Sequence, residues 1–219
     1  MRFITRFRTG VLGHLSALFC ARLTFANNAS EMGQSGAVAA SVPTLVVVSG
    51  PAGFGKTTLA HRLAAALACP AICRDEIKEG MARSASDDAP EVGDALALAT
   101  LSTFFDVLRL LLERGITVVA EAAFQDQVWA PNLAPLGALC EFRVVQCHTD
   151  LATARRRVAE HVSTRRVHAD RALLALIERN DGYFSDFRRV SLDAPTISVD
   201  TTDGYEPTIE AIVAFVEGR

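Results

Sequence analysis

The stretch that decides the fold of this chain is Gly50-Pro51-Ala52-Gly53-Phe54-Gly55-Lys56-Thr57. It follows the pattern G-x-x-x-x-G-K-[ST], in which glycines allow the backbone to turn its N–H groups inward around phosphate oxygens. A valine-rich apolar run at 45–48 precedes the stretch and predicts a buried strand. The alanine- and leucine-rich run 58–67 follows it and predicts a helix. A strand, a glycine loop and a helix in this order predict a phosphate-binding loop.

The loop offers three kinds of group to a nucleotide. Lys56 is expected to reach the β- and γ-phosphates, and the hydroxyl of Thr57 is expected to ligate Mg²⁺. The amides at the start of the helix add partial positive charge. We therefore expect ATP to be bound by Gly50, Pro51, Ala52, Gly53, Phe54, Gly55, Lys56, Thr57 and Thr58. The alternative is a glycine-rich turn without a ligand, which the flanking strand and helix disfavour.

The composition is that of an ordinary globular protein. The chain has 219 residues, of which 50% are hydrophobic and 21% are charged, enough for one α/β domain with a full core. A net charge of -3 argues against a protein that binds the nucleic-acid backbone. The five cysteines form no C-x-x-C pair, which favours buried free thiols in a reducing compartment over zinc ligands or disulfides.

The first 42 residues differ from the rest of the chain. They carry four arginines against a single glutamate, and a fairly apolar run lies at 11–26. We interpret residues 1–42 as a basic extension that is either disordered or translated from a start codon assigned too early, with Met32 as another start. A secretory signal fits less well, because His14 and Arg22 interrupt the apolar run and no transmembrane helix fits there. The expected use of ATP favours the cytoplasm.

Residues 43–219 form the predicted domain, in which strands and helices alternate. The predicted strands lie at 45–48, 70–73, 116–120, 142–147 and 196–200. The main predicted helices lie at 58–67, from 76 onward, at 92–113, from 151 onward and at 207–216. Such an alternation predicts an α/β fold with a mostly parallel sheet.

Two carboxylates stand at the ends of predicted strands. Asp75 follows the strand at 70–73, where it would face the ligand crevice of an open α/β sheet and could accept a proton from a hydroxyl. Its alternative role is to cap a helix that starts at Glu76. Glu121 ends the strand at 116–120, where it could hold Mg²⁺ opposite Thr57. The alternative for Glu121 is an ion pair with a nearby base.

A basic segment follows the fourth predicted strand. Six arginines lie within 155–171, beside two histidines. Such a charge run is usually a solvated helix face. Because a phosphate-binding loop is present in the same chain, we favour a mobile lid at about 158–171 whose arginines neutralise charge on the transferring phosphoryl group. Further along, the turn at 201–204 is expected to lie near the adenine.

These motifs resemble small P-loop kinases of the chloramphenicol phosphotransferase, zeta-toxin and polynucleotide-kinase types and the AAA-domain group, over residues 44–217. The resemblance implies a three-layer P-loop NTPase fold with a sheet of about five strands, helices on both faces and an arginine-rich lid. It also implies that Asp75 is the general base and that Arg157 contacts the nucleotide. The lid arginines map loosely onto Arg165 and Arg166. His161 stands where such kinases often have a second arginine.

The preferred functional hypothesis is an ATP-dependent phosphotransferase that acts on a hydroxyl of a small molecule. Its catalytic residues would be Lys56, Asp75, Arg157 and Arg165, with Mg²⁺ between Thr57 and Glu121. One alternative is a nucleotide-driven switch or ATPase without a small acceptor. Another is a polynucleotide 5′-kinase, which would need a basic groove lined by aromatic residues, whereas only 7% of the residues are aromatic. Neither a nucleic-acid partner nor a membrane is expected, and the acceptor and oligomeric state stay open.

Overall fold

The computed structural model describes residues 42–84, 93–164, 177 and 182–219. The chain divides into two units after Val38, and all described residues belong to the second unit, Ala39–Arg219. The predicted N-terminal extension therefore lies almost entirely outside the described residues. The second half of the predicted lid, residues 165–171 with Arg165 and Arg166, also lies outside the described residues.

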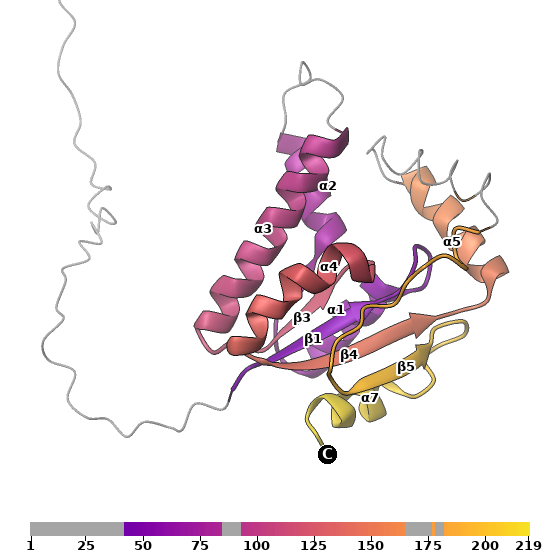
Figure 1. Ribbon diagram of the computed structural model, residues 1–219. Helices are drawn as coiled ribbons and strands as arrows, with labels where there is room; N and C mark the ends of the chain where they lie inside the picture. The colour runs from indigo at the N-terminus through magenta and orange to yellow at the C-terminus, as the bar shows by residue number, and fades with distance from the viewer. Residues whose placement is uncertain (1–41, 85–92, 165–176, 178–181) are drawn as a thin grey trace, which may run out of the picture. The chain divides into compact units, whose positions relative to one another are not determined.

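The described domain is built on a five-stranded sheet in the order β2-β3-β1-β4-β5 (Figure 1). Every neighbouring pair of strands is parallel. The strands are β1 Thr44–Ser49, β2 Ala71–Cys73, β3 Val118–Glu121, β4 Glu141–His148 and β5 Thr196–Asp200. This confirms the predicted parallel sheet. Strand β3 lies between β1 and β2, so β3, rather than β2, is the neighbour of the strand that leads into the glycine loop.

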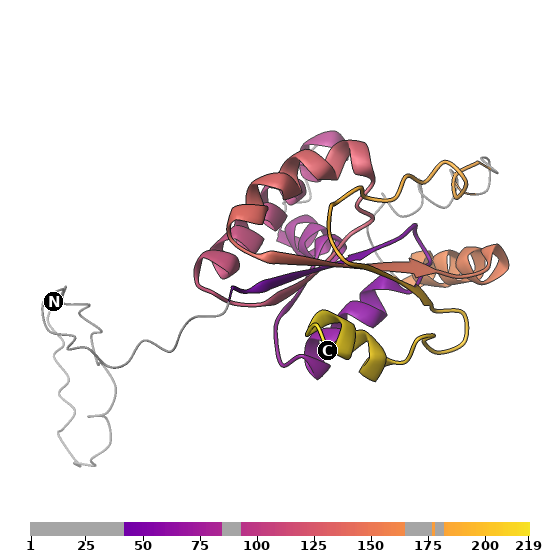
Figure 2. The ribbon, with the colours of Figure 1, turned by 60° about the horizontal axis from the view of Figure 1, so that its bottom comes forward.

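Helices cover both faces of the sheet, which confirms the predicted three layers. Figure 2 shows the sheet nearly edge-on, with α3 and α4 on one face and α1 and α7 on the other. The helices are α1 Lys56–Ala66, α2 Arg74–Ser84, α3 Gly93–Glu113, α4 Asp126–Leu133, α5 Leu151–Thr164 and α7 Ile209–Val216. Helix α4 contains Pro131 and is followed by a short 3₁₀ helix, Ala134–Ala138.

The alternation of side chains along β1 separates two cores. Leu45 and Val47 pack into a cluster with α3 and α4, which holds Trp129 and the phenylalanines at 104, 105 and 124. Val46 and Val48 pack on the opposite face with Leu59 and other residues of α1 and α7. Because both faces of β1 are covered, its apolar run is continuous rather than alternating.

The aromatic cluster lies beneath the apolar helix α3. Phe124 is fully buried, with its ring centroid 4.8 Å from that of Trp129. Residues 95–113 of α3 are long and apolar enough to cross a membrane by length and composition alone. Phe104 and Leu108 on this helix are completely buried in the core of the domain. Packing in the core therefore accounts for part of the apolar character of α3, since 28% of the apolar window is buried.

Candidate active site

The glycine loop leads from β1 directly into α1, as predicted. Gly53 and Gly55 adopt positive φ angles of 78° and 73°, a region that favours glycine. A Cβ at Gly53 would lie 2.4 Å from the carbonyl oxygen of Ala154, so the backbone of α5 is in close contact with the loop at this residue. Gly55 is the N-cap of α1 and provides no side-chain cap. The first amides of α1 are therefore left for an anionic ligand.

The structure brings together the two predicted metal ligands. The hydroxyl of Thr57 donates a hydrogen bond of 3.1 Å to Oε2 of Glu121. The contact follows from the sheet, because Glu121 lies beside Val48 in the β1–β3 register. A hydroxyl and a carboxylate are hard oxygen ligands of the type that Mg²⁺ prefers. The donor set at this position therefore fits the predicted ion.

Lys56 lies beside the same carboxylate. Its Nζ donates to the carbonyl oxygen of Pro51 at 2.9 Å and lies 3.7 Å from Oε1 of Glu121. Only 3% of the Glu121 side chain is exposed. Burial raises the pKa of Glu121, and Lys56 opposes this shift through its positive charge. Burial disfavours the negative charge of this carboxylate, and a bound cation would favour that charge.

Arg157 joins three parts of the site. From α5 its guanidinium donates to the carbonyl oxygen of Gly53 at 3.4 Å. It also donates to the carbonyl oxygens of Thr201 and Thr202 at 2.6 Å and 3.2 Å. The predicted nucleotide-binding arginine thus lies beside the loop, where it fixes α5 and the turn after β5 to the loop backbone. By contrast, Arg155 and Arg156 of the same helix are exposed, as their helical spacing predicts.

Thr201 lies in the turn that was expected near the adenine, but its contact with the glycine loop was not predicted. Its side chain is 3% exposed, and its hydroxyl donates to the carbonyl oxygen of Phe54 at 3.0 Å. The hydroxyl oxygen of Thr201 also accepts a hydrogen bond of 3.2 Å from Nη1 of Arg157. The hydroxyl therefore holds the glycine loop against the end of β5. The only signal in the sequence is the position of a threonine directly after an apolar strand.

Asp75 lies in the first turn of α2, two residues after β2. Helix α2 begins at Arg74, so Asp75 is not the N-cap that its alternative role required. Its side chain is 59% exposed and accepts a hydrogen bond of 2.9 Å from Nη1 of Arg74. The charge of Asp75 contributes to the raised pKa of both Glu121 and Tyr183. The carboxylate thus acts electrostatically on the glycine-loop end of the sheet.

Two aromatic residues that follow the predicted lid also reach the loop. Burial raises the pKa of the Tyr183 phenol, and the nearby backbone N–H of Ala52 opposes this shift. The ring of Phe184 stacks on that of Phe54 with 5.7 Å between the centroids. Both residues were missed, because an aromatic pair in a long connection has no periodicity that would assign it to a site.

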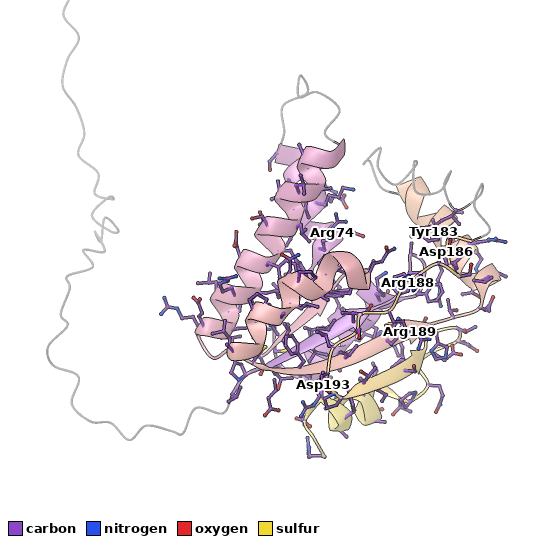
Figure 3. The ribbon with its side chains drawn as sticks, viewed as in Figure 1. Arg74, Tyr183, Asp186, Arg188, Arg189 and Asp193 are labelled. Atoms are coloured by element: carbon purple, nitrogen blue, oxygen red, sulfur yellow. The ribbon has the colours of Figure 1, made fainter. Side chains whose placement is uncertain are left out.

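The segment that carries Tyr183 then crosses toward β5. Figure 3 shows Tyr183, Asp186 and Arg188 along this path, with Arg74 on the neighbouring α2. Beyond Arg189 the segment packs on the core under α3 and α4 through Val190, Leu192 and Ala194. Arg188 and Arg189 are exposed. The segment is therefore anchored at the loop by aromatic rings and at the opposite face by aliphatic side chains.

The fold and the glycine loop define a P-loop nucleotide-binding domain. The sequence model of the family described as AAA domain matches residues 45–180. The chain belongs to this family. No curated protein matches the chain.

Several solved structures share the fold. A predicted kinase from Chloroflexus aurantiacus is similar with a TM-score of 0.66 and 22% identity, over 81% of this chain and 98% of that chain. A sugar kinase from Janibacter has a TM-score of 0.55 and 16% identity, over 81% and 95% of the two chains. The APS kinase of Mycobacterium tuberculosis has a TM-score of 0.53 and 18% identity, over 80% and 97%. The family and these likenesses confirm the resemblance to P-loop kinases.

Proposed function

We propose that the chain is an ATP-dependent kinase that transfers the γ-phosphoryl group to a hydroxyl of a small molecule. The observation that carries the proposal is the meeting of Thr57, Lys56 and Glu121 at the glycine loop. Two solved structures with the same fold support it, since one is a sugar kinase and the other an APS kinase in complex with AMPPNP and APS.

The nucleotide half of the site would be formed by residues 50–58. Their amides would surround the phosphates, and Lys56 would exchange its contact with the Pro51 carbonyl for a phosphate oxygen. Thr57 and Glu121 would hold Mg²⁺, which when bound neutralises charge on the phosphates. Arg157 would keep α5 and the β5 turn against the loop while the nucleotide is bound.

The acceptor half would be organised around Asp75. Its exposed carboxylate can take the proton of an acceptor hydroxyl, whose oxygen then forms a bond to the γ-phosphorus. The bond from that phosphorus to the bridging oxygen breaks, and ADP leaves with the bonding pair. Arg74 restrains the carboxylate by its hydrogen bond of 2.9 Å. We further propose that Arg165, outside the described residues, contributes positive charge to the transferring group.

The test is a pair of variants in an ADP-release assay with Mg·ATP and a panel of sugars, sugar acids, amino sugars and nucleosides. Lys56→Ala should abolish transfer. Asp75→Asn should retain the wild-type affinity for Mg·AMP-PNP in calorimetry and lose transfer, because the positioned base is worth about 10²–10⁴-fold in rate. The control is Asp106→Asn, an exposed acid on α3 that accepts a hydrogen bond from Ser102.

Three outcomes would count against the proposal. Unchanged turnover in Asp75→Asn would remove the base. Hydrolysis of ATP that no acceptor stimulates would favour a switch or ATPase instead. Phosphorylation of oligonucleotide 5′ ends, but of no small molecule, would favour a polynucleotide kinase.

A further inference from the structure

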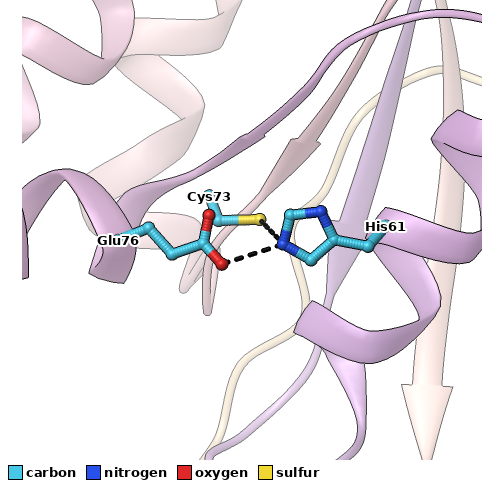
Figure 4. Close-up of side chains that lie close together, drawn as sticks. All are labelled: His61, Cys73 and Glu76. Atoms are coloured by element: carbon cyan, nitrogen blue, oxygen red, sulfur yellow. Dashed lines mark hydrogen bonds and ion pairs between the residues drawn. The ribbon is translucent and has the colours of Figure 1, made fainter.

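A second cluster of polar groups lies between α1, β2 and α2, and the proposed reaction does not use it. Nε2 of His61 on α1 lies 3.7 Å from Sγ of Cys73 at the end of β2. The same nitrogen lies 2.8 Å from Oε1 of Glu76 in the first turn of α2. Figure 4 shows both contacts converging on this nitrogen. The three ligand atoms all lie within 4.8 Å of one another.

The spacing of these atoms is close to that of a tetrahedral zinc site. With Zn–S near 2.3 Å and Zn–N near 2.0–2.1 Å, tetrahedral geometry separates sulfur from nitrogen by roughly 3.6 Å. The observed separation of Cys73 Sγ and His61 Nε2 is 3.7 Å. The carboxylate of Glu76 would have to withdraw from the imidazole by roughly half an ångström to reach its own tetrahedral position. It has the freedom to do so, since its side chain is 47% exposed.

The ligand types select the ion. A thiol, an imidazole and a carboxylate suit Zn²⁺, whereas Mg²⁺ takes oxygen ligands such as Thr57 and Glu121. The two sites are thus chemically distinct although Cys73 and Glu121 are partners in the β2–β3 register. Three carboxylates, those of Glu121, Glu76 and Asp75, add negative charge around Cys73, which favours a cation at this position. A thiol that coordinates a metal ion is deprotonated, and the ion offsets the charge of the thiolate.

The burial of the three side chains suits an ion bound from the surface. Cys73 is 2% exposed, so its sulfur is protected and can be approached from the direction of His61. The side chain of His61 is 50% exposed. Three protein ligands would leave the fourth position of the ion to water.

We propose that His61, Cys73 and Glu76 bind a zinc ion. The ion would link α1, which starts at Lys56, to α2, which carries Asp75. It would thereby fix the distance between these two helices. This inference does not depend on the proposed kinase activity, because its ligands lie outside the nucleotide and acceptor groups.

The test is a cobalt titration of the full chain, purified without metal. Co²⁺ bound by a thiolate in a tetrahedral site gives a near-ultraviolet charge-transfer band and intense visible bands, which oxygen ligands alone do not give. We expect these bands in the wild type and their displacement by Zn²⁺. Cys73→Ser should abolish the charge-transfer band. His61→Gln and Glu76→Gln, at exposed positions that do not threaten folding, should weaken zinc binding at least about tenfold.

Matched controls keep the test specific. Cys69→Ser removes a partly buried thiol four residues away, and His148→Gln removes a partly buried histidine that lies 3.5 Å from Asp200. Both variants should retain the bands and the zinc affinity of the wild type. Zinc should also raise the thermal midpoint of the wild type and not that of His61→Gln. A wild type without a charge-transfer band, or a band that survives Cys73→Ser, would overturn the inference and leave a hydrogen-bonded histidine–glutamate pair.

Discussion

Replacing Gly53 by alanine tests whether α5 supports the phosphate-binding loop. The residue has a φ angle of 78°, and adopting this region costs an L residue about 1–2 kcal/mol. The added Cβ would lie 2.4 Å from the Ala154 carbonyl oxygen, about 1 Å inside the ordinary contact distance of 3.4–4 Å. That oxygen belongs to helix backbone, so relief requires a shift of the loop or of α5, and such overpacking costs about 1–3 kcal/mol.

Gly204 provides the matched control. Its φ angle is 88°, but nothing lies within 4 Å of the position of its Cβ. The unfolding free energy of Gly204→Ala should therefore fall only by the cost of the positive φ angle, about 1–2 kcal/mol. The unfolding free energy of Gly53→Ala should fall by about 2–5 kcal/mol, the sum of the φ cost and the overpacking cost. The stabilisation gained by restricting the unfolded chain applies to both variants and cancels in the comparison.

The assay is urea denaturation of both variants and the wild type without nucleotide, followed by the fluorescence of Trp129. This is the only tryptophan of the chain, and it is 6% exposed in the core. Calorimetric titration with Mg·ATP should show weaker binding by Gly53→Ala than by Gly204→Ala. Equal losses of unfolding free energy in the two variants would refute the close contact between α5 and the loop.

Three further predictions concern other side chains of the site. Arg157→Ala should lower the unfolding free energy in urea by about 1.5–3 kcal/mol and weaken nucleotide binding, because it removes charged donors to carbonyls of the loop and of the β5 turn; unchanged affinity would contradict its role. Burial raises the pKa of Glu121 above 4.5, so above this pH the folded wild type binds more protons than its unfolded chain. Without Mg²⁺, the unfolding free energy of the wild type relative to that of Glu121→Gln should therefore fall as the pH increases from 4.5. A difference that does not change with pH would contradict the shift. Tyr183→Phe keeps the ring and removes the phenol oxygen near the Ala52 amide of the loop, so it should weaken Mg·ATP binding in calorimetry with little change in urea stability. Tyr205→Phe is its control.

The sequence predicted the parts of the site that lie close to the ends of strands. The strand, loop and helix around Lys56 are determined locally, by glycine positions and by the spacing of apolar residues. The contact between Thr57 and Glu121 joins residues 64 positions apart, yet it was predictable because each residue lies near the carboxyl end of a parallel strand. The role of β3 as the neighbour of β1 was not predicted, since strand order depends on how the connections pack.

The groups that were missed depend on side-chain orientation over long separations. The hydroxyl of Thr201 contacts Phe54 across 147 positions, and no local pattern specifies its direction. His61 and Cys73 were not associated in the sequence, because one lies in a helix pattern and the other ends a strand of three residues. Only the packing of α1 beside β2 brings them together. The lid arginines Arg165 and Arg166 lie outside the described residues, and their role stays a prediction.

The position of β3 between β2 and β1 has a consequence for synthesis on the ribosome. Among the described strands, β1 pairs with β3 and β4, and β2 pairs with β3 alone. A nascent chain that ends before Val118 thus contains two strands that share no ladder. Non-local pairing brings no stabilisation until the partner strand exists, so such a nascent chain should remain sensitive to proteases. Once β3 has emerged, it can pair with both β1 and β2, and the same pairing places Glu121 beside the glycine loop.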